Sequence, residues 1–169
     1  MEPGVRCRMT DRASLRAPTS GGHMFRNIVV GTDGSDTAAI AVAAATELAR
    51  LTGATLHIAT VGGATTSAML GDPLAGAAAM SIAAEETRDE LTSIVDRAAG
   101  PAREQGVTVA THALIGSAAQ ALCDLAESVD ADLLLVGNRG MQGGRRFLGS
   151  VPNTISHHAP CSVLIYETT

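Results

Sequence analysis

Short runs of β-branched residues and leucine alternate with alanine-rich segments of helical period along most of this chain. Strands are predicted at 25–32, 54–61, 107–115, 132–136 and 161–166, and helices at 35–52, 77–105, 117–128 and 151–158. Strands that alternate with helices pair in parallel, because each crossover returns the chain to the same end of the sheet. We therefore expect an α/β fold, a doubly wound three-layer sandwich with a five-stranded parallel sheet.

Turn-forming residues mark the ends of these elements. Ser35 or Asp36 is the expected N-cap of the first helix and Gly53 its stop. The long second helix is expected to be interrupted near Gly100-Pro101, because proline removes a helical hydrogen bond. The segment 62–80 is either a flap beside a ligand, a partner surface or a variable insertion, and the residues alone do not separate these.

One domain is expected over residues 25–169. Residues 1–24 contain Pro, Gly, Ser and Arg without a sustained apolar period, and we interpret them as a disordered leader or upstream extension. No run of about 18 apolar residues or signal-peptide region is found. The three cysteines are spaced unlike a disulfide framework. These features predict a cytoplasmic protein without a membrane partner, with Cys123 and Cys161 as small buried hydrophobes.

Composition excludes several functions. A formal net charge of −5 and an aromatic content of 2% argue against a nucleic-acid partner, which needs cationic surface and stacking platforms. All twelve basic residues are arginine. A Walker A lysine and a Schiff-base lysine are therefore both excluded.

The segment from Gly137 to Ser150 carries the strongest chemical signal. An unbroken apolar run enters a loop with five glycines and three arginines, which ends at Ser150, the expected N-cap of a helix with Pro152 in its first turn. Such a loop allows backbone N–H groups to converge on a phosphate, and the helix N-terminus adds partial positive charge. The competing interpretation is a solvated surface loop.

A second turn, Thr32 to Ser35, follows the first strand and should lie beside this loop at the switch in strand order. A carboxylate such as Asp33 repels phosphates unless a cation or a sugar hydroxyl lies between them. We favour a ligand role for Asp33 and a capping role for Ser35.

Two motifs together resemble the universal stress protein family. Gly137-x-x-Gly140 followed by Gly149-Ser150 looks like that family's ATP-binding signature, and the turn at 30–35 looks like its first strand and turn. The stretch from Gly149 to Ile165 is similar to its last helix and strand. The resemblance implies an adenine nucleotide, ATP or cyclic AMP, bound between the first and fourth strands, and a homodimer, often through the last strand Cys161–Tyr166.

The resemblance also implies a set of nucleotide-binding residues, with Asp33 near the ribose or a phosphate-bound Mg²⁺. The set comprises Gly31, Thr32, Asp33, Gly137, Asn138, Arg139, Gly140, Gly149, Ser150, Val151 and Pro152. One departure is the spacer Met141–Leu148, which has eight residues where the family usually has nine. The shorter loop changes the geometry around the phosphates of a bound nucleotide. The adjacent glycines Gly143 and Gly144 have the conformational freedom to compensate for the missing residue.

The function predicted from these features is a dimeric nucleotide-binding regulatory or stress-response protein. Any ATPase activity should be weak, because only Asp33 and the loop arginines suit catalysis and no motif positions a water. The alternatives are a protein-interaction module without a nucleotide and a phosphotransfer enzyme. The chain does not resemble a dinucleotide-dependent dehydrogenase, because the GxGxxG motif of that class is missing after the first predicted strand.

The spacing of the histidines does not indicate a metal site. His157 and His158 are adjacent on a helix, so their side chains diverge, and a position against the helix dipole explains them better. His57 and His112 fall on different predicted strands, and spacing pairs neither of them with another ligand.

Overall fold

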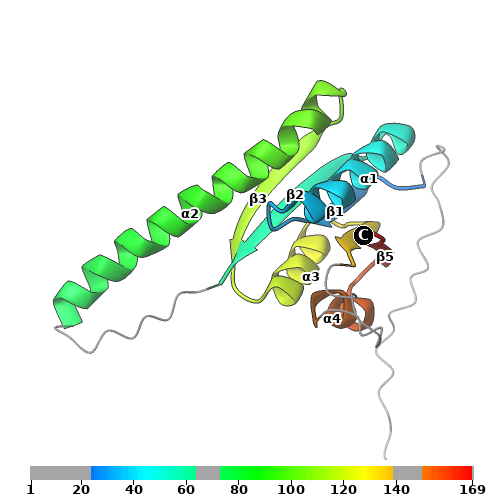
Figure 1. Cartoon of the computed structure of the whole chain (residues 1–169). Helices are drawn as coiled ribbons and strands as arrows, with labels where there is room; N and C mark the ends of the chain where they lie inside the picture. The colour runs from blue at the N-terminus through cyan, green and yellow to red at the C-terminus, as the bar shows by residue number, and fades with distance from the viewer. Residues whose placement is uncertain (1–23, 64–72, 139–149, 169) are drawn as a thin grey trace, which may run out of the picture.

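The computed structural model describes residues 24–63, 73–138 and 150–168, which alternate between strands and helices (Figure 1). The elements are β1 (Asn27–Gly31), α1 (Asp36–Thr52), β2 (Thr55–Gly62), α2 (Pro73–Glu104), β3 (Val109–Ile115), α3 (Ala118–Ser128), β4 (Leu133–Gly137), α4 (Ser150–His158) and β5 (Ser162–Tyr166). Their order and types match the sequence prediction. The predicted extent of the domain, and the leader before it, stay predictions.

The five strands form one parallel sheet in the order β3-β2-β1-β4-β5. From β1 the chain proceeds outward through β2 to β3, and it then returns to the other side of β1 to add β4 and β5. The strand order therefore reverses between β1 and β4, which confirms the doubly wound α/β fold and the expected switch point.

Two apolar layers enclose the sheet. Alternate residues of β1, such as Ile28 and Val30, pack with residues of α1 and α2, whereas Val29 packs with residues of α3 and α4. Figure 1 shows α1 and α2 running along the same side of the sheet. Because both faces are covered, every buried position of β1 and β4 holds an apolar residue, as the unbroken apolar run in β4 indicates.

Local hydrogen bonds define α1 as the sequence predicts. Ser35 is the N-cap, with an extended backbone, and its hydroxyl oxygen accepts from the amide of Ala38 at 3.3 Å. Gly53 ends the helix in the left-handed conformation with φ 69°, and its N–H bonds to the carbonyl of Ala49. The predicted cap and stop of this helix are both confirmed.

The expected interruption at Gly100-Pro101 is wrong, because α2 continues to Glu104. Val95, Ala99 and Ala102 are almost fully buried around this point, so packing against the sheet holds the final turns in the helical conformation. Gly100 has no Cβ to clash with the proline ring that follows, a clash that normally disfavours helix at this position. Although α2 is 32 residues long, none of the described helices is both long and apolar enough to span a membrane.

Two histidines of neighbouring strands contact each other, the buried His57 of β2 and the half-buried His112 of β3. His57 Nδ1 lies 3.1 Å from His112 Nε2, while the ring centroids are 5.3 Å apart. The rings therefore meet through their nitrogen edges. Sequence spacing missed this pair, because the β2–β3 register, which aligns His112 with Ala59, brings the two residues together.

Burial lowers the pKa of both imidazoles, and the charge of His112 lowers the pKa of His57 further. A hydrogen bond between two ring nitrogens needs one donor and one acceptor, so it forms in the neutral pair and is lost when both facing nitrogens carry protons. The pair is consequently a polar contact between β2 and β3 that exists while at least one of the two facing nitrogens has no proton.

Replacing Pro101 with alanine should stabilise the protein by about 2 kcal/mol. The estimate is a helix-interior penalty of about 3 kcal/mol less about 1 kcal/mol for the proline's restriction of the unfolded chain. Pro73→Ala is the matched control, because Pro73 is the first residue of the same helix, where no intrahelical bond is lost. Urea unfolding measures both variants, and a destabilised Pro101→Ala would contradict the continuous helix.

Acidification below about pH 6.5, the ordinary histidine pKa, should reduce the free energy of unfolding. Folding lowers the pKa of His57 and of His112, so the unfolded chain takes up protons first as the pH falls. The contribution of this pair to the free energy of unfolding is complete at pH values above the histidine pKa of the unfolded chain. It declines as the pH falls below that pKa. Urea titrations from about pH 8 to 5 should therefore show a smaller decline for the variant His57→Gln/His112→Gln. An equal decline in both proteins would refute the role of the pair.

Candidate functional site

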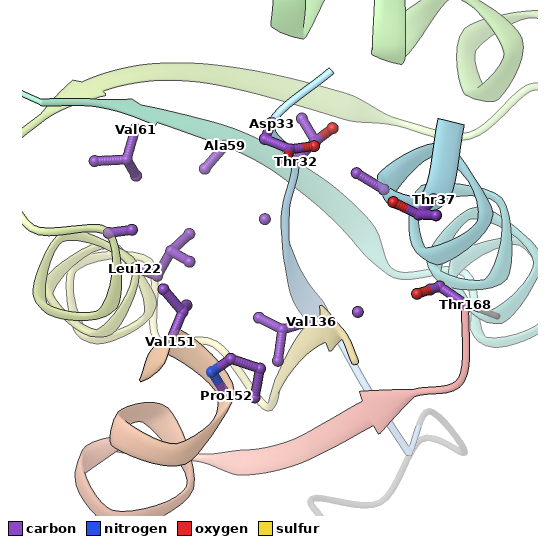
Figure 2. Close-up of a pocket in the computed structure, with 14 residues that line it drawn as sticks. Thr32, Asp33, Thr37, Ala59, Val61, Leu122, Val136, Val151, Pro152 and Thr168 are labelled. Atoms are coloured by element: carbon purple, nitrogen blue, oxygen red, sulfur yellow. The ribbon is translucent and has the colours of Figure 1, made fainter. Parts of the chain in front are cut away.

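A cavity of about 250 Å³ opens at the carboxyl ends of β1 and β4, where the strand order reverses (Figure 2). Its walls come from α1, α3 and α4, from the turn after β1, from the ends of β1, β2 and β4, and from the segment after β5. The lining residues are Gly31, Thr32, Asp33, Thr37, Ala38, Ala59, Val61, Ala118, Leu122, Val136, Gly137, Val151, Pro152 and Thr168. Open α/β sheets bind ligands at this position.

The cavity has an apolar side and a polar side. Figure 2 shows Leu122 of α3 and Val151 of α4 close together on one side, with Thr37 of α1 and Thr168 opposite them. Asp33 is the one ionisable side chain among the described residues that line the cavity. The described walls therefore suit a molecule with a flat apolar part and hydroxyl groups.

The turn after β1 is fixed by its own side chains. The amide of Thr32 donates to the carbonyl of Ala59 at 2.8 Å, which holds the turn against β2. The Asp33 carboxylate accepts from the backbone N–H of Ser35 at 3.0 Å and also from the Ser35 hydroxyl. Asp33 thus lines the cavity while it stabilises the turn, and Ser35 has the capping role expected of it.

Two glycines at the strand ends make room for neighbouring side chains. A Cβ added to Gly31 would lie 3.0 Å from Cδ1 of Leu122, and one added to Gly137 would lie 3.1 Å from Cγ2 of Thr168. Both contacts are tighter than ordinary van der Waals packing. The family resemblance implied nucleotide binding for both glycines, and the loop pattern predicted close approach of a phosphate at Gly137; in the structure both make room for the side chains of the cavity walls.

Six of the predicted residues line the cavity: Gly31, Thr32, Asp33, Gly137, Val151 and Pro152. Arg139, Gly140 and Gly149 lie outside the described residues, as does the Ser150 side chain. Ser150 is the first residue of α4 and not the cap before it, a shift of one position. The N-terminal turn of α4 nevertheless borders the cavity through Val151 and Pro152, with its partial positive charge on that side.

Asn138 does not line the cavity but holds a residue that does. Its Oδ1 accepts from both the backbone N–H and the hydroxyl of Thr168, each at 2.9 Å. Thr168 was missed by sequence reasoning, because no motif marks it and only the β4–β5 pairing brings it to Asn138. Thr37, Ala59 and Val61 were also missed, although their places at a helix start and a strand end could have indicated them.

The surroundings of the two described cysteines disfavour the thiolate form, which is the nucleophilic one. Burial, with a smaller contribution from the charge of Asp124, raises the pKa of the Cys123 thiol. Burial, followed by the charges of Cys123 and Asp132, raises the pKa of Cys161 to about 11. Cys123 is buried and Cys161 half-buried in the apolar layer under α3 and α4, in agreement with their predicted packing role.

A metal centre is not formed by the described side chains alone, since they contain no group of three or more His, Cys, Asp or Glu residues arranged to hold an ion. Asp33 could contribute one oxygen ligand to a cation carried in by a ligand's phosphates. No other carboxylate of the described residues reaches the cavity.

Comparison with known proteins places this chain in a family. A family model for the Universal stress protein family matches residues 24–167. Universal stress protein Sll1388 from Synechocystis sp. is 39% identical over 83 residues, 48% of this chain and 51% of that protein, so the match spans about half the length of that relative. Universal stress protein YxiE from Bacillus subtilis is 34% identical over 146 residues, 84% of this chain and 99% of that protein.

A solved structure agrees with these sequence matches. A universal stress protein in complex with cAMP superimposes with a TM-score of 0.64 at 32% identity, covering 86% of this chain and 98% of the other. The sequence resemblance and the family match both extend from the first strand to the last. This is the region that forms the five-stranded sheet. The chain belongs to the universal stress protein family.

Proposed function

We propose that this protein binds an adenine nucleotide, ATP or cyclic AMP, in the cavity between β1 and β4 and acts as a cytoplasmic regulatory or stress-response factor. The observation that carries the proposal is the meeting of two distant motifs on one cavity. Thr32 and Asp33 come from the first turn, and Gly137, Val151 and Pro152 come from the end of the chain. A related protein is known in complex with cAMP, which supports a ligand of this class.

The chemistry of the walls suits the parts of a nucleotide. Leu122, Val61 and Val151 offer apolar surface to a purine, and the polar side with Thr37 and Asp33 suits a ribose. The phosphates would then extend toward the N-terminus of α4, whose backbone N–H groups and dipole favour anions. The loop residues Arg139, Gly140, Gly149 and Ser150 would complete the proposed phosphate end, and Asn138 precedes them at the end of β4.

We infer that turnover is slow. Phosphoryl transfer needs an oriented water and positioned charges, and Asp33 alone among the described lining residues ionises. Mg²⁺ bridged to the phosphates would have Asp33 as its protein ligand, an oxygen donor of the kind that Mg²⁺ prefers. The protein then works by holding a nucleotide, so its occupied and empty forms differ in what they present to partners.

We also propose a homodimer formed through β5. This strand pairs only with β4 among the described strands, so its outer edge has unpaired backbone groups. Leu164 and Tyr166 are each 38% exposed and alternate with inward-facing Val163 and Ile165. A free edge with an exposed apolar pair is suited to joining a second copy of the chain, and the joined strands would cover both features.

Filling the cavity should weaken nucleotide binding. Ala118→Phe places a ring in the cavity wall at the start of α3, whereas Gln120→Phe places the same ring on the exposed side of that helix. Calorimetric titration with ATP and cyclic AMP should show at least about a tenfold weaker affinity for the first variant, about 1.4 kcal/mol, and no change for the second. If wild-type protein binds neither ligand at millimolar concentration, the nucleotide proposal fails and the interaction module replaces it.

A charge on β5 should dissociate the dimer. Leu164→Lys puts an ammonium group into the proposed interface, and Ile115→Lys provides the control, because Ile115 is similarly exposed at 43% on the opposite edge strand. Sedimentation equilibrium should give a monomer for Leu164→Lys and a dimer for wild type and control. A dimeric Leu164→Lys protein would place the interface elsewhere.

A further inference from the structure

Thr168 follows β5 and yet forms part of the cavity wall. It is only 3% exposed. The amide of Asn138 donates to the carbonyl of Tyr166 at 3.0 Å, so the β4–β5 pairing extends to the ends of both strands. The chain then turns across the end of β4, where Asn138 Oδ1 accepts two hydrogen bonds from Thr168, each 2.9 Å long. We call these two bonds the Asn138–Thr168 latch.

The latch fits into a space that the neighbouring residues leave open. A Cβ on Gly137 would lie 3.1 Å from Cγ2 and 3.4 Å from Oγ1 of Thr168, and 3.8 Å from Cβ of Ala41 in α1. Thr168 therefore fills the space between the end of β4 and α1. A Cβ at position 137 would require Thr168 to shift by a few tenths of an ångström, which gives Gly137 a packing role independent of phosphate.

The latch also determines what Thr168 can offer a ligand. A hydroxyl has one hydrogen to donate and two lone pairs that accept. The hydrogen of Thr168 Oγ1 is committed to Asn138 Oδ1, since a carbonyl-type oxygen only accepts. Toward the cavity Thr168 can therefore act only as an acceptor, like the ionised carboxylate of Asp33, which lines the same cavity.

We propose that Thr168, oriented by Asn138, is a specificity-determining residue that accepts a hydrogen bond from a hydroxyl of the bound nucleotide's ribose. An acceptor in this wall favours ligand groups that donate and disfavours phosphate oxygens, which at neutral pH only accept. Figure 2 shows Thr168 on the polar side of the cavity, with Thr37. The inference rests on the proposed nucleotide function and adds the sugar selectivity of the site.

The decisive experiment compares ATP with its 2′-deoxy and 3′-deoxy analogues by calorimetry in wild type and in variants of Thr168. One of the two deoxy analogues should bind wild type about fivefold more weakly than ATP, the effect of one hydrogen bond. Thr168→Val keeps the shape of the side chain but has no oxygen, so this difference should vanish. Thr168→Ser keeps the hydroxyl and should retain it.

Two further variants separate selectivity from a general loss of structure. Asn138→Ala removes the latch and should reduce the deoxy difference as Thr168→Val does. Thr92→Val changes an exposed threonine on α2, away from the cavity, and should leave every affinity unchanged. A merely structural role for Thr168 would weaken ATP and both analogues by one common factor.

The outcomes distinguish the two proposals. If wild type binds ATP and the deoxy difference persists in Thr168→Val, the role of Thr168 is refuted while nucleotide binding stands. The same holds if wild type binds ATP and both analogues equally. If wild type binds none of the three nucleotides, the sugar selectivity is refuted, and the proposed function fails as well when cyclic AMP does not bind.

Discussion

Parallel pairing of β1 with β4 is the contact on which the site depends, because it joins the two halves of the chain. Ile28, Val29 and Val30 align with Leu133, Leu134 and Leu135, and all six side chains are almost fully buried. At the start of the strands the Asp132 carboxylate accepts from the backbone N–H groups of Arg26 and Asn27, at 2.7 and 3.1 Å. The register anchored there brings the opposite ends, Gly31 and Gly137, to one cavity.

The composition of the chain explains how closely the helices around that cavity approach the strand ends. Small residues dominate its walls, so α1 and α3 come near the strand ends, and Leu122 can pack over Gly31. A core of alanine, valine, leucine and isoleucine needs many such close approaches to fill its volume, because no tryptophan and few aromatic rings are present. Close packing of helices and a ligand-sized space beside them therefore arise from the same small side chains.

Sequence reasoning predicted the order of elements, the switch point and the two ends of α1 correctly, because these depend on local pattern and capping. It failed at Pro101, where burial of Val95 and Ala99 outweighs a local rule against proline in helices. It also failed to pair His57 with His112, since contacts between strands depend on register, which no spacing within one segment reveals. Six of the residues predicted for the site line one cavity, and Thr168, which lines it too, was missed for the same reason.

Asn138 has a different role in the structure from the one that its place in the sequence motif predicts. Its place after the first glycine of a nucleotide-binding signature predicts contact with the ligand, yet its Oδ1 is occupied by two donors from Thr168. An oxygen that accepts two hydrogen bonds at 2.9 Å has both lone pairs engaged, so it has none left for another donor. Asn138 then acts on a ligand through the residue it holds. The chemistry presented to the cavity at that point is accordingly the hydroxyl oxygen of Thr168, limited by the latch to accepting hydrogen bonds.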